Sequence, residues 1–465
     1  MEITKDIKDT MSALSEVNLD FLAFVEKNPG CLNRANFSDL EELRNRFHLL
    51  QPWPTFLSRE RKAMFEEAGV KLFNLIKSIP ERLFQNNTLE MSAYYALPVN
   101  VLKLQMEGVT KEHLDNLLAR GDFIFSPSGL KCMEYNIAGN LGGHRLPLWE
   151  SLYLKNPLVF RFLKEYSITI KNRNLLEQYL AHCIRVAQPM VSRSDVGEVN
   201  IALVLMKDIL ENLGPMSGYL EQLYRELLRR EYPSLSGDLF LCDFPHLDVV
   251  DDWVYYKGRK IHALTEWYAG VLPPHIMKAF KAGNIPIMNG PITCLMSSKL
   301  NLALLSEHAD ADSGFFSPGE KEIIREYVPW SRKIVPGETT YRHERIRLED
   351  FIPANKNTLV MKPSLGYGGD NVYLGINVPQ DEWEKQVEIA LSTKSWLVQE
   401  LVESSPALYQ QGENGCAPYD QTWGFFIFGS HYAGTFLRVM PKKDVPRIIN
   451  THQGAQISIV FDVDK

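Results

Sequence analysis

Apolar side chains recur at helical spacing through most of the first 118 residues. The stretches LDFLAFVEK (19–27), DLEELRNRFHLL (39–50) and RKAMFEEAGVKLFNLIKSI (61–79) place hydrophobic residues three or four positions apart, the spacing of one helix face. The proline in IPE (79–81) predicts that the third helix ends there. We therefore expect a mainly helical region over residues 1–118.

Beyond residue 118 the hydrophobic pattern changes to short β-like runs. FIFSPSGLKCMEYNI (123–137) contains two such runs, and its SPSG predicts a hairpin turn between them. Residues 151–290 then alternate strand-like runs (VNIALVL, DLFLCDF) with helical ones (SGYLEQLYRELLRREY), which indicates an α/β layer. We assign residues 119–150 to the strand pair and residues 151–290 to a second domain.

Residues 291–465 have the pattern of an α+β unit. PITCLMSSKLNLALLSEH (291–308) has helical spacing, and SRKIVPGETTYRHERIRLEDFIPANKN (331–357) has the composition of a linker. The remaining residues predict a strand, a glycine-rich loop, a strand, a helix, a strand and two further strands.

Composition and charge narrow the classes of protein. The 465 residues, 45% of them hydrophobic, suffice for two or three domains. The net charge of -7 argues against general binding to nucleic acid or anionic membrane. The first 20 residues lack the apolar core of a secretory signal, and no apolar run approaches the roughly 18 residues of a membrane span. The six cysteines lack CxxC spacing. We expect a cytoplasmic protein with reduced thiols.

The first candidate for chemistry is the stretch LVMKPSLGYGGDNVYLG (359–375). Lys362 precedes Gly366, Gly368 and Gly369, whereas a Walker loop or a dinucleotide fingerprint opens a helix. Because NVYLG is β-prone, we predict two antiparallel strands joined by the glycine loop. Such a loop can lay its backbone over a polyphosphate, which Lys362 would also contact. An ordinary hairpin turn is the alternative.

Two further segments contain residues that could bind a nucleotide. Lys299 interrupts the apolar run LMSSKLNLALL, so it is either on an exposed helix face or a phosphate ligand. The run WLVQELVE (396–403) has a backbone that could pair with an adenine edge, and an ordinary edge strand is the alternative. Four of its residues form the candidate adenine segment: Gln399, Glu400, Leu401 and Val402.

An acidic cluster is predicted on the two strands after residue 118. Glu134 and Asn136 are two positions apart, so they share a strand face, and Asp122 can approach from the neighbouring strand. Two carboxylates and an amide oxygen suit Mg²⁺; a solvated sheet face is the alternative. Arg120 and Arg438 are either salt-bridge partners or clamps on a transferring phosphoryl group.

Taken together, these segments resemble the circularly permuted ATP-grasp ligases, a branch that includes glutathionylspermidine synthetase and is related to eukaryotic glutathione synthetase. The likeness extends over most of residues 120–460. It assigns the family's roles to the following positions: metal binding to Asp122, Glu134 and Asn136; ATP binding to Lys299, Lys362, Gly366, Gly368, Gly369 and Gln399 to Val402; catalysis to Arg120 and Arg438.

The resemblance implies an α/β fold with a circularly permuted ATP-grasp core, an inserted α/β substrate domain and a helical N-terminal region. The implied activity is an ATP- and Mg²⁺-dependent ligation of a small-molecule carboxylate to an amine through an acyl phosphate. It implies no nucleic acid partner, no membrane and no particular oligomeric state. A phosphotransferase and a catalytically silent nucleotide-binding scaffold are the alternatives.

One departure and one set of candidates accompany this resemblance. Relatives closer to glutathione synthetase have a metal-binding glutamate in the glycine loop, where this chain has Gly366 or Tyr367. Asp122 would have to fill that role. The candidate acceptor residues are Asn140, His144, Arg145 and Glu266, and for each of them a purely structural role is the alternative.

Overall fold

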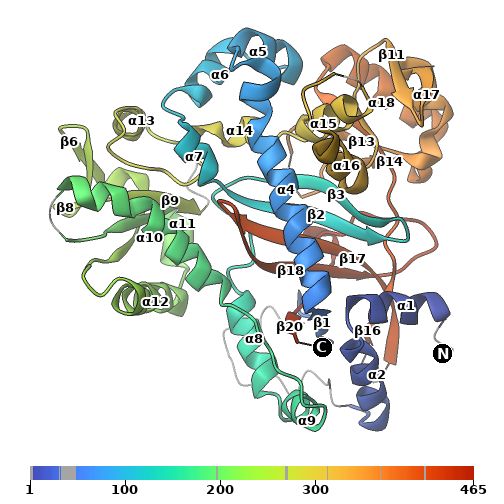
Figure 1. The fold of residues 1–465 in the computed structure, drawn as a ribbon, viewed down its shortest axis with the longest axis horizontal. Coiled ribbons are helices and arrows are strands. Elements are labelled where there is room, and N and C mark those ends of the chain that lie inside the picture. The colour runs from blue at the N-terminus through green and yellow to red at the C-terminus, as the bar shows by residue number, and fades with distance from the viewer. Residues whose placement is uncertain are drawn as a thin grey trace.

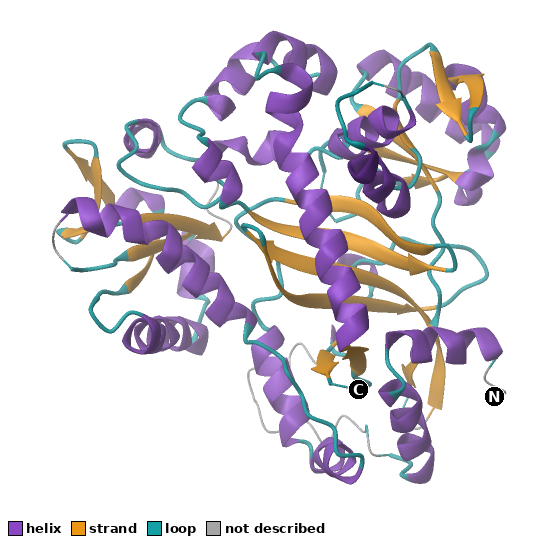
Figure 2. Ribbon diagram, viewed as in Figure 1, coloured by secondary structure: helices purple, strands orange, loops and turns teal. Residues whose placement is uncertain are grey.

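The chain forms a mixed α/β structure with several separate sheets (Figure 2), which confirms the expected fold class at that level. The computed structural model describes residues 4–30, 32, 49–194, 197–267, 271–311, 313–366, 368–412 and 415–464. No helix within these residues is long and apolar enough to cross a membrane.

The largest sheet is antiparallel and has its C-terminal and early strands side by side (Figure 1). Its strands, in spatial order, are β19 (Gln456–Ser458), β18 (His431–Pro441), β17 (Gly415–Phe428), β2 (Leu118–Ser126) and β3 (Gly129–Asn136), with β16 (Ala407–Gln411) also paired to β17. The turn between β2 and β3 is the predicted SPSG hairpin. β17 therefore joins the predicted metal strands to the strand that carries Arg438.

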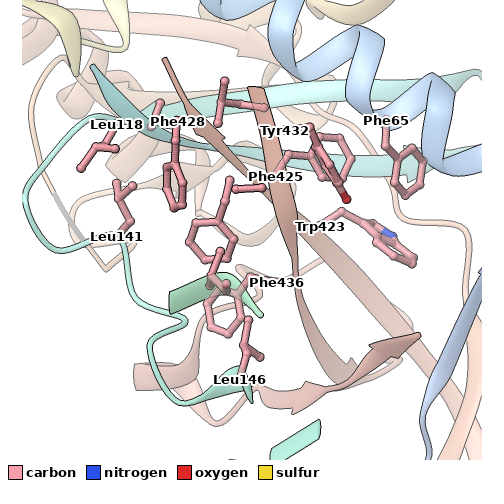
Figure 3. Close-up of a cluster of buried hydrophobic side chains, with 14 of the residues drawn as sticks. Phe65, Leu118, Leu141, Leu146, Trp423, Phe425, Phe428, Tyr432 and Phe436 are labelled. Carbon is pink, nitrogen blue, oxygen red and sulfur yellow. The ribbon is translucent and has the colours of Figure 1, made fainter. Parts of the chain in front are cut away.

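Helix α4 (Arg59–Phe84) crosses one face of this sheet (Figure 1) and closes its core. The Phe65 ring stacks on Phe425 at 4.7 Å between centroids, within the cluster shown in Figure 3. A side chain at Gly69 would begin 3.0 Å from Ile427, so glycine allows the close approach. The predicted helix end at residues 79–81 is wrong: α4 continues through Pro80, because buried Ile79 and Phe84 keep its last turns in the core.

The rest of the N-terminal region is mainly helical, as predicted. Its described helices are α1 (Lys5–Leu14), α2 (Val17–Lys27), α5 (Thr88–Tyr95), α6 (Val99–Met106) and α7 (Lys111–Asp115). Strand β1 (Thr55–Ser58) pairs in parallel with β20 (Val460–Val463), which ties this region to the C-terminal end. Most of the helix predicted over 39–50 lies outside the described residues.

Two small sheets lie within residues 151–290. The described strands are β4 (Ile201–Leu205), β5 (Leu239–Cys242), β6 (Leu247–Val250), β7 (Trp253–Tyr256), β8 (Arg259–Lys260) and β9 (Ala263–Trp267). The order β5-β4-β9 is parallel, which explains why every residue of β4 is buried. The helices here and just before are α8 (Leu146–Lys155), α9 (Pro157–Glu165), α10 (Leu175–Ser194), α11 (Lys207–Glu211), α12 (Pro215–Glu231) and α13 (Pro274–Lys281).

A four-stranded antiparallel sheet carries the glycine hairpin. Its order is β10 (Ser331–Lys333), β15 (Trp396–Glu400), β13 (Leu359–Pro363) and β14 (Tyr373–Leu374). The linker predicted over 331–357 is wrong. These residues instead form β10, the hairpin of β11 (Glu338–Tyr341) and β12 (Glu344–Arg347), and α17 (Leu348–Ala354), because Ile334, Leu348 and Ile352 pack under the sheet. Helix α18 (Gln380–Thr393) follows as predicted.

The helical stretch after residue 290 is divided. A turn, η4 (Gly290–Ile292), leads into α14 (Thr293–Met296), and α15 (Leu300–Asp310) begins after a break that includes Lys299; α16 (Pro318–Tyr327) follows. The backbone N–H of Lys299 donates to the Ser364 carbonyl at 2.8 Å, outside the helix ladder. This break places Lys299 beside the glycine hairpin instead of on a continuous helix.

Candidate functional site

The β2–β3 hairpin brings the three predicted metal ligands together. Asp122 lies directly opposite Glu134, and Arg120 lies opposite Asn136. Asn136 Nδ2 is 3.1 Å from Asp122 Oδ2 and 3.5 Å from Glu134 Oε1. The alternative of a solvated sheet face is wrong for Asp122, which is only 3% exposed.

Two arginines hold the Asp122 carboxylate. Arg120 Nε and Nη2 donate to its two oxygens at 2.9 and 3.0 Å, and Arg438 Nη2 lies 2.9 Å from Oδ2. Gly424, opposite Asp122 on β17, leaves the room that Arg120 occupies, since a Cβ there would be 2.9 Å from Arg120 Cδ. Burial raises the pKa of Asp122, but the two guanidinium groups outweigh it and lower the pKa to about 2.

The two predicted lysines reach the same cluster from other elements, Lys362 from β13 and Lys299 from the break between α14 and α15. Lys362 Nζ donates to Gln399 Oε1 at 2.6 Å and lies 3.4 Å from the Met133 carbonyl. Lys299 Nζ lies 3.2 Å from Glu134 Oε2 and donates to the Gly366 carbonyl at 2.9 Å. The exposed-face alternative is wrong for Lys299, which is 7% exposed.

The cluster has more positive than negative side chains. Two carboxylates, Asp122 and Glu134, face four cations: Arg120, Arg438, Lys299 and Lys362. Burial lowers the pKa of Lys362 to about 8, although the charge of Glu134 opposes the shift. The ammonium is therefore charged for the most part at neutral pH. When all six groups are ionised, the excess of two positive charges favours an anionic ligand.

The glycine hairpin has the predicted strand–loop–strand form. Val360 and Met361 of β13 pair in antiparallel register with β14. Gly368 and Gly369 have φ of +71° and +81°, in the left-handed region. A Cβ on Gly369 would lie 2.9 Å from Ile448 Cγ2, so the loop rests on the chain after β18. Tyr367, part of the departure from the family pattern, lies outside the described residues.

The candidate adenine segment begins inside its sheet, where Gln399 and Glu400 end β15, and continues into the loop with Leu401 and Val402. β15 lies between β10 and β13, so the edge-strand alternative is wrong. The Gln399 side chain is buried and links Lys362 to Ser331 Oγ, to which its Nε2 donates at 3.0 Å. Gln399 therefore positions Lys362. The N–H groups of Glu400 and Leu401 donate to neighbouring carbonyls of the chain.

A cleft of about 910 Å³ joins these groups. Its lining includes the apolar side chains of Ile124, Val360, Leu374, Leu401 and Ile448. The predicted residues among its lining are Asp122, Glu134, Lys299, Lys362, Gly366, Gly369, Gln399, Glu400, Leu401, Val402 and Arg438. A cleft lined by both apolar and cationic side chains suits a molecule with an apolar ring and a polyanionic tail.

A second, more open cavity of about 2110 Å³ adjoins the first. Arg438 and Asn450 line both cavities, and the three other predicted residues, Arg120, Asn136 and Gly368, line the second. The charged cluster thus lies where the two cavities meet.

Only two of the four candidate acceptor residues line the second cavity. Asn140 and Glu266 line the second cavity, next to Gly139, where a Cβ would lie 2.6 Å from Glu266 Cγ. His144 instead lies against the Trp267 ring, and Arg145 precedes α8. Burial raises the pKa of Glu266 to about 7.

Sequence reasoning missed the segment after β18. Arg447, Ile448 and Asn450 line the 910 Å³ cleft, and Ile448 lies against the glycine loop at Gly369. The arginine in DVPRIIN was the available signal, but a single arginine in a polar loop indicates only a surface position.

The donor set is compatible with Mg²⁺ brought by a phosphate ligand. Within the described ranges there is no group of three or more His, Cys, Asp or Glu side chains that could hold a metal by itself. Asp122 and Glu134 can each contribute a carboxylate oxygen as a ligand. Rotating the Asn136 amide by half a turn would add its carbonyl oxygen as a third ligand. Arg438 Nε is buried without a hydrogen-bond partner among the described residues. A buried donor of this kind is expected where a bound anion would accept its hydrogen bond. Few protein ligands plus phosphate oxygens is the usual Mg²⁺ arrangement.

Comparison with known proteins adds little to this geometry. No protein-family profile matches the chain, and no curated protein matches it. Among solved structures, a protein of Methylobacillus flagellatus titled "Putative gamma-glutamylcysteine synthetase" is similar over 84% of this chain and 87% of its own, with 11% identity and a TM-score of 0.38. A likeness this distant supports no functional argument, so what the site can do must be judged from its own residues.

Proposed function

We propose that the chain is an ATP- and Mg²⁺-dependent carboxylate–amine ligase with a circularly permuted ATP-grasp core. The observation that supports this most is the meeting of four cations, two carboxylates and an amide at the junction of two cavities. The permutation corresponds to the strands of Asp122 and Glu134 preceding the glycine hairpin in the chain. In the same proposal, residues 291–465 bind nucleotide and residues 151–290 contribute to the substrate site.

In this mechanism adenine packs against apolar side chains of the cleft beside β15, and the triphosphate extends toward the charged cluster. Lys299, Lys362 and Arg438 neutralise the phosphates, while the glycine loop covers them. Bound Mg²⁺, held by Asp122, Glu134 and Asn136, would supply further charge neutralisation.

The reaction transfers the γ-phosphoryl group of ATP to a substrate carboxylate, which yields ADP and an acyl phosphate. An amine then attacks the acyl carbon, the C–O bond to phosphate breaks, and an amide and inorganic phosphate are released. Arg120 and Arg438 lie where the carboxylate and the transferring group would meet, at the junction of the cavities. In this proposal the amine binds at Glu266, which lines the second cavity.

The test is ADP release with pairs of carboxylate and amine substrates, followed by mass spectrometry of the product. Lys362→Ala and Asp122→Ala should each lower the rate by roughly 10²–10³-fold, whereas Lys385→Ala, on the exposed side of α18, should have no effect. Unchanged ADP release in both site variants would refute the assignment. A phosphorylated acid without an amide would instead indicate a phosphotransferase.

A further inference from the structure

The N-terminal region contributes a wall of the second cavity. Val101, Leu104 and Gln105 of α6 line it, although they precede the metal strands in the chain. α6 is held there by its packing on η4 and α14, and Pro291 of η4 and Cys294 of α14 also line the cavity. α6 and α14 lie close together in Figure 1.

This wall is apolar where a soluble surface would ordinarily be polar. Leu104 is 47% exposed and opens onto the cavity, and Leu272 and Met277, at the start of α13, line the same space. Phe436 of β18 adds an aromatic face below Arg120, whose guanidinium lies 5.5 Å from the ring centroid. Exposed apolar side chains gathered in a concave site are typical of ligand-binding surfaces.

The same wall contains a buried acceptor atom without a partner. Gln105 is 7% exposed, and its Oε1 makes no hydrogen bond to the described residues. Leaving such an atom unpaired costs stability. The atom has less than 1 Å² of accessible surface, so a turn of the Gln105 side chain toward the cavity would present it to a ligand N–H. Glu266 lines the same cavity. Its carboxylate forms no salt bridge with a described residue.

We propose that α6 and the start of α13 select the amine substrate, and that this substrate is a primary amine with an apolar body. Its ammonium group would bind at Glu266, a further N–H would donate to Gln105 Oε1, and its hydrocarbon part would lie against Leu104, Leu272 and Met277. The inference rests on the proposed ligase function, whose amine it specifies. A polyamine or a small polar amine would leave the apolar wall uncovered.

The experiment measures binding to the full chain by calorimetry, without nucleotide, for three amines with one head group: leucinamide, glycinamide and lysinamide. Leucinamide should bind roughly tenfold or more tightly than the other two. Leu104→Asp, at an exposed position, should remove this preference. Leu89→Asp, on the neighbouring helix α5 and 65% exposed but not part of the cavity lining, should leave it intact. Gln105→Leu should weaken binding of all three.

No binding of any amine, equal binding of the three, or a preference that survives Leu104→Asp would overturn the proposal. ADP release with the same amines separates this failure from failure of the proposed function. Amide formation without a leucinamide preference would leave the ligase assignment in place and refute the role of α6. Selective leucinamide binding without any ATP-dependent product would support the role of α6 and refute the ligase assignment.

Discussion

Lys362 is positioned by protein oxygens within a largely buried site. Its ammonium lies 2.6 Å from Gln399 Oε1, the residue is 8% exposed, and its pKa is lowered to about 8, mainly by burial. A nearly buried cation that keeps its charge at neutral pH can receive a phosphate without first losing a large hydration shell.

This pKa predicts how nucleotide affinity depends on pH. Below pH 8 the Lys362 ammonium is charged and attracts the phosphates; above pH 8 the free protein loses that charge, so ATP affinity should fall by up to about tenfold per pH unit. Lys362→Arg should keep a flatter profile between pH 8 and 10, because arginine stays charged. Nucleotide titrations from pH 7 to 10 measure this. Identical profiles for the two proteins would contradict the assignment.

Burial also shifts the pKa of Glu266, upward in this case, and this predicts a pH-dependent change in stability. Burial raises its pKa from 4.5 to about 7, so the folded state resists ionisation of this carboxyl between those values, and the destabilisation is complete above pH 7. Glu266→Gln should therefore stabilise the protein at pH 8 by up to about 3 kcal/mol, with little change at pH 4.5. Denaturant unfolding at both pH values tests this. An equal change at both would show that ionisation is not involved.

In the proposed function, the element that covers the nucleotide is the glycine hairpin between β13 and β14. Gly369 combines a φ of +81° with a close approach to Ile448, whereas Gly258, in the β7–β8 turn, has a φ of +77° and open space around its Cβ position. Comparing the two positions separates backbone strain from lost contact.

Gly369→Ala should raise the KM for ATP by about tenfold, because the added methyl displaces the loop from the segment it rests on and strain costs about 1–2 kcal/mol. Gly258→Ala should carry the backbone strain alone and leave the KM for ATP unchanged. Steady-state ADP release gives both values. A KM that is unaffected by Gly369→Ala would mean that the loop does not cover the phosphates.

At the scale of the whole molecule, α4 unites elements from distant parts of the sequence. Phe65 packs on Trp423 and Phe425 of β17. This strand lies between β2 and β18, which both carry residues of the charged cluster. Figure 3 shows these rings in one continuous cluster. The helical N-terminal region is therefore part of the core that supports the site.

Phe65→Ala should lower the free energy of unfolding by about 3–5 kcal/mol, since the residue is fully buried. Phe160→Ala, at a position that is 60% exposed, should change it by less than about 0.5 kcal/mol. Denaturant unfolding followed by tryptophan fluorescence measures both. Equal effects would show that α4 does not stabilise the main sheet.

Local patterns predicted local structure well. The β2–β3 hairpin, the alternation that sets Glu134 and Asn136 on one side, and the strand–loop–strand form of the glycine hairpin all follow from spacing and turn residues. The linker over 331–357 and the helix end at Pro80 were wrong for a shared reason. Burial against other elements outweighed polar composition in the first case and a proline in the second.

The sequence by itself determined which residue types stand on which strand and loop, because period-two alternation and glycine conformations are properties of neighbouring positions. Only the tertiary structure decided that Lys362 meets Glu134 across two sheets, that β15 is an interior strand, and that α6 lines the second cavity. Those outcomes depend on pairing and packing between segments up to hundreds of residues apart, and no local periodicity records which distant surface a buried face will meet.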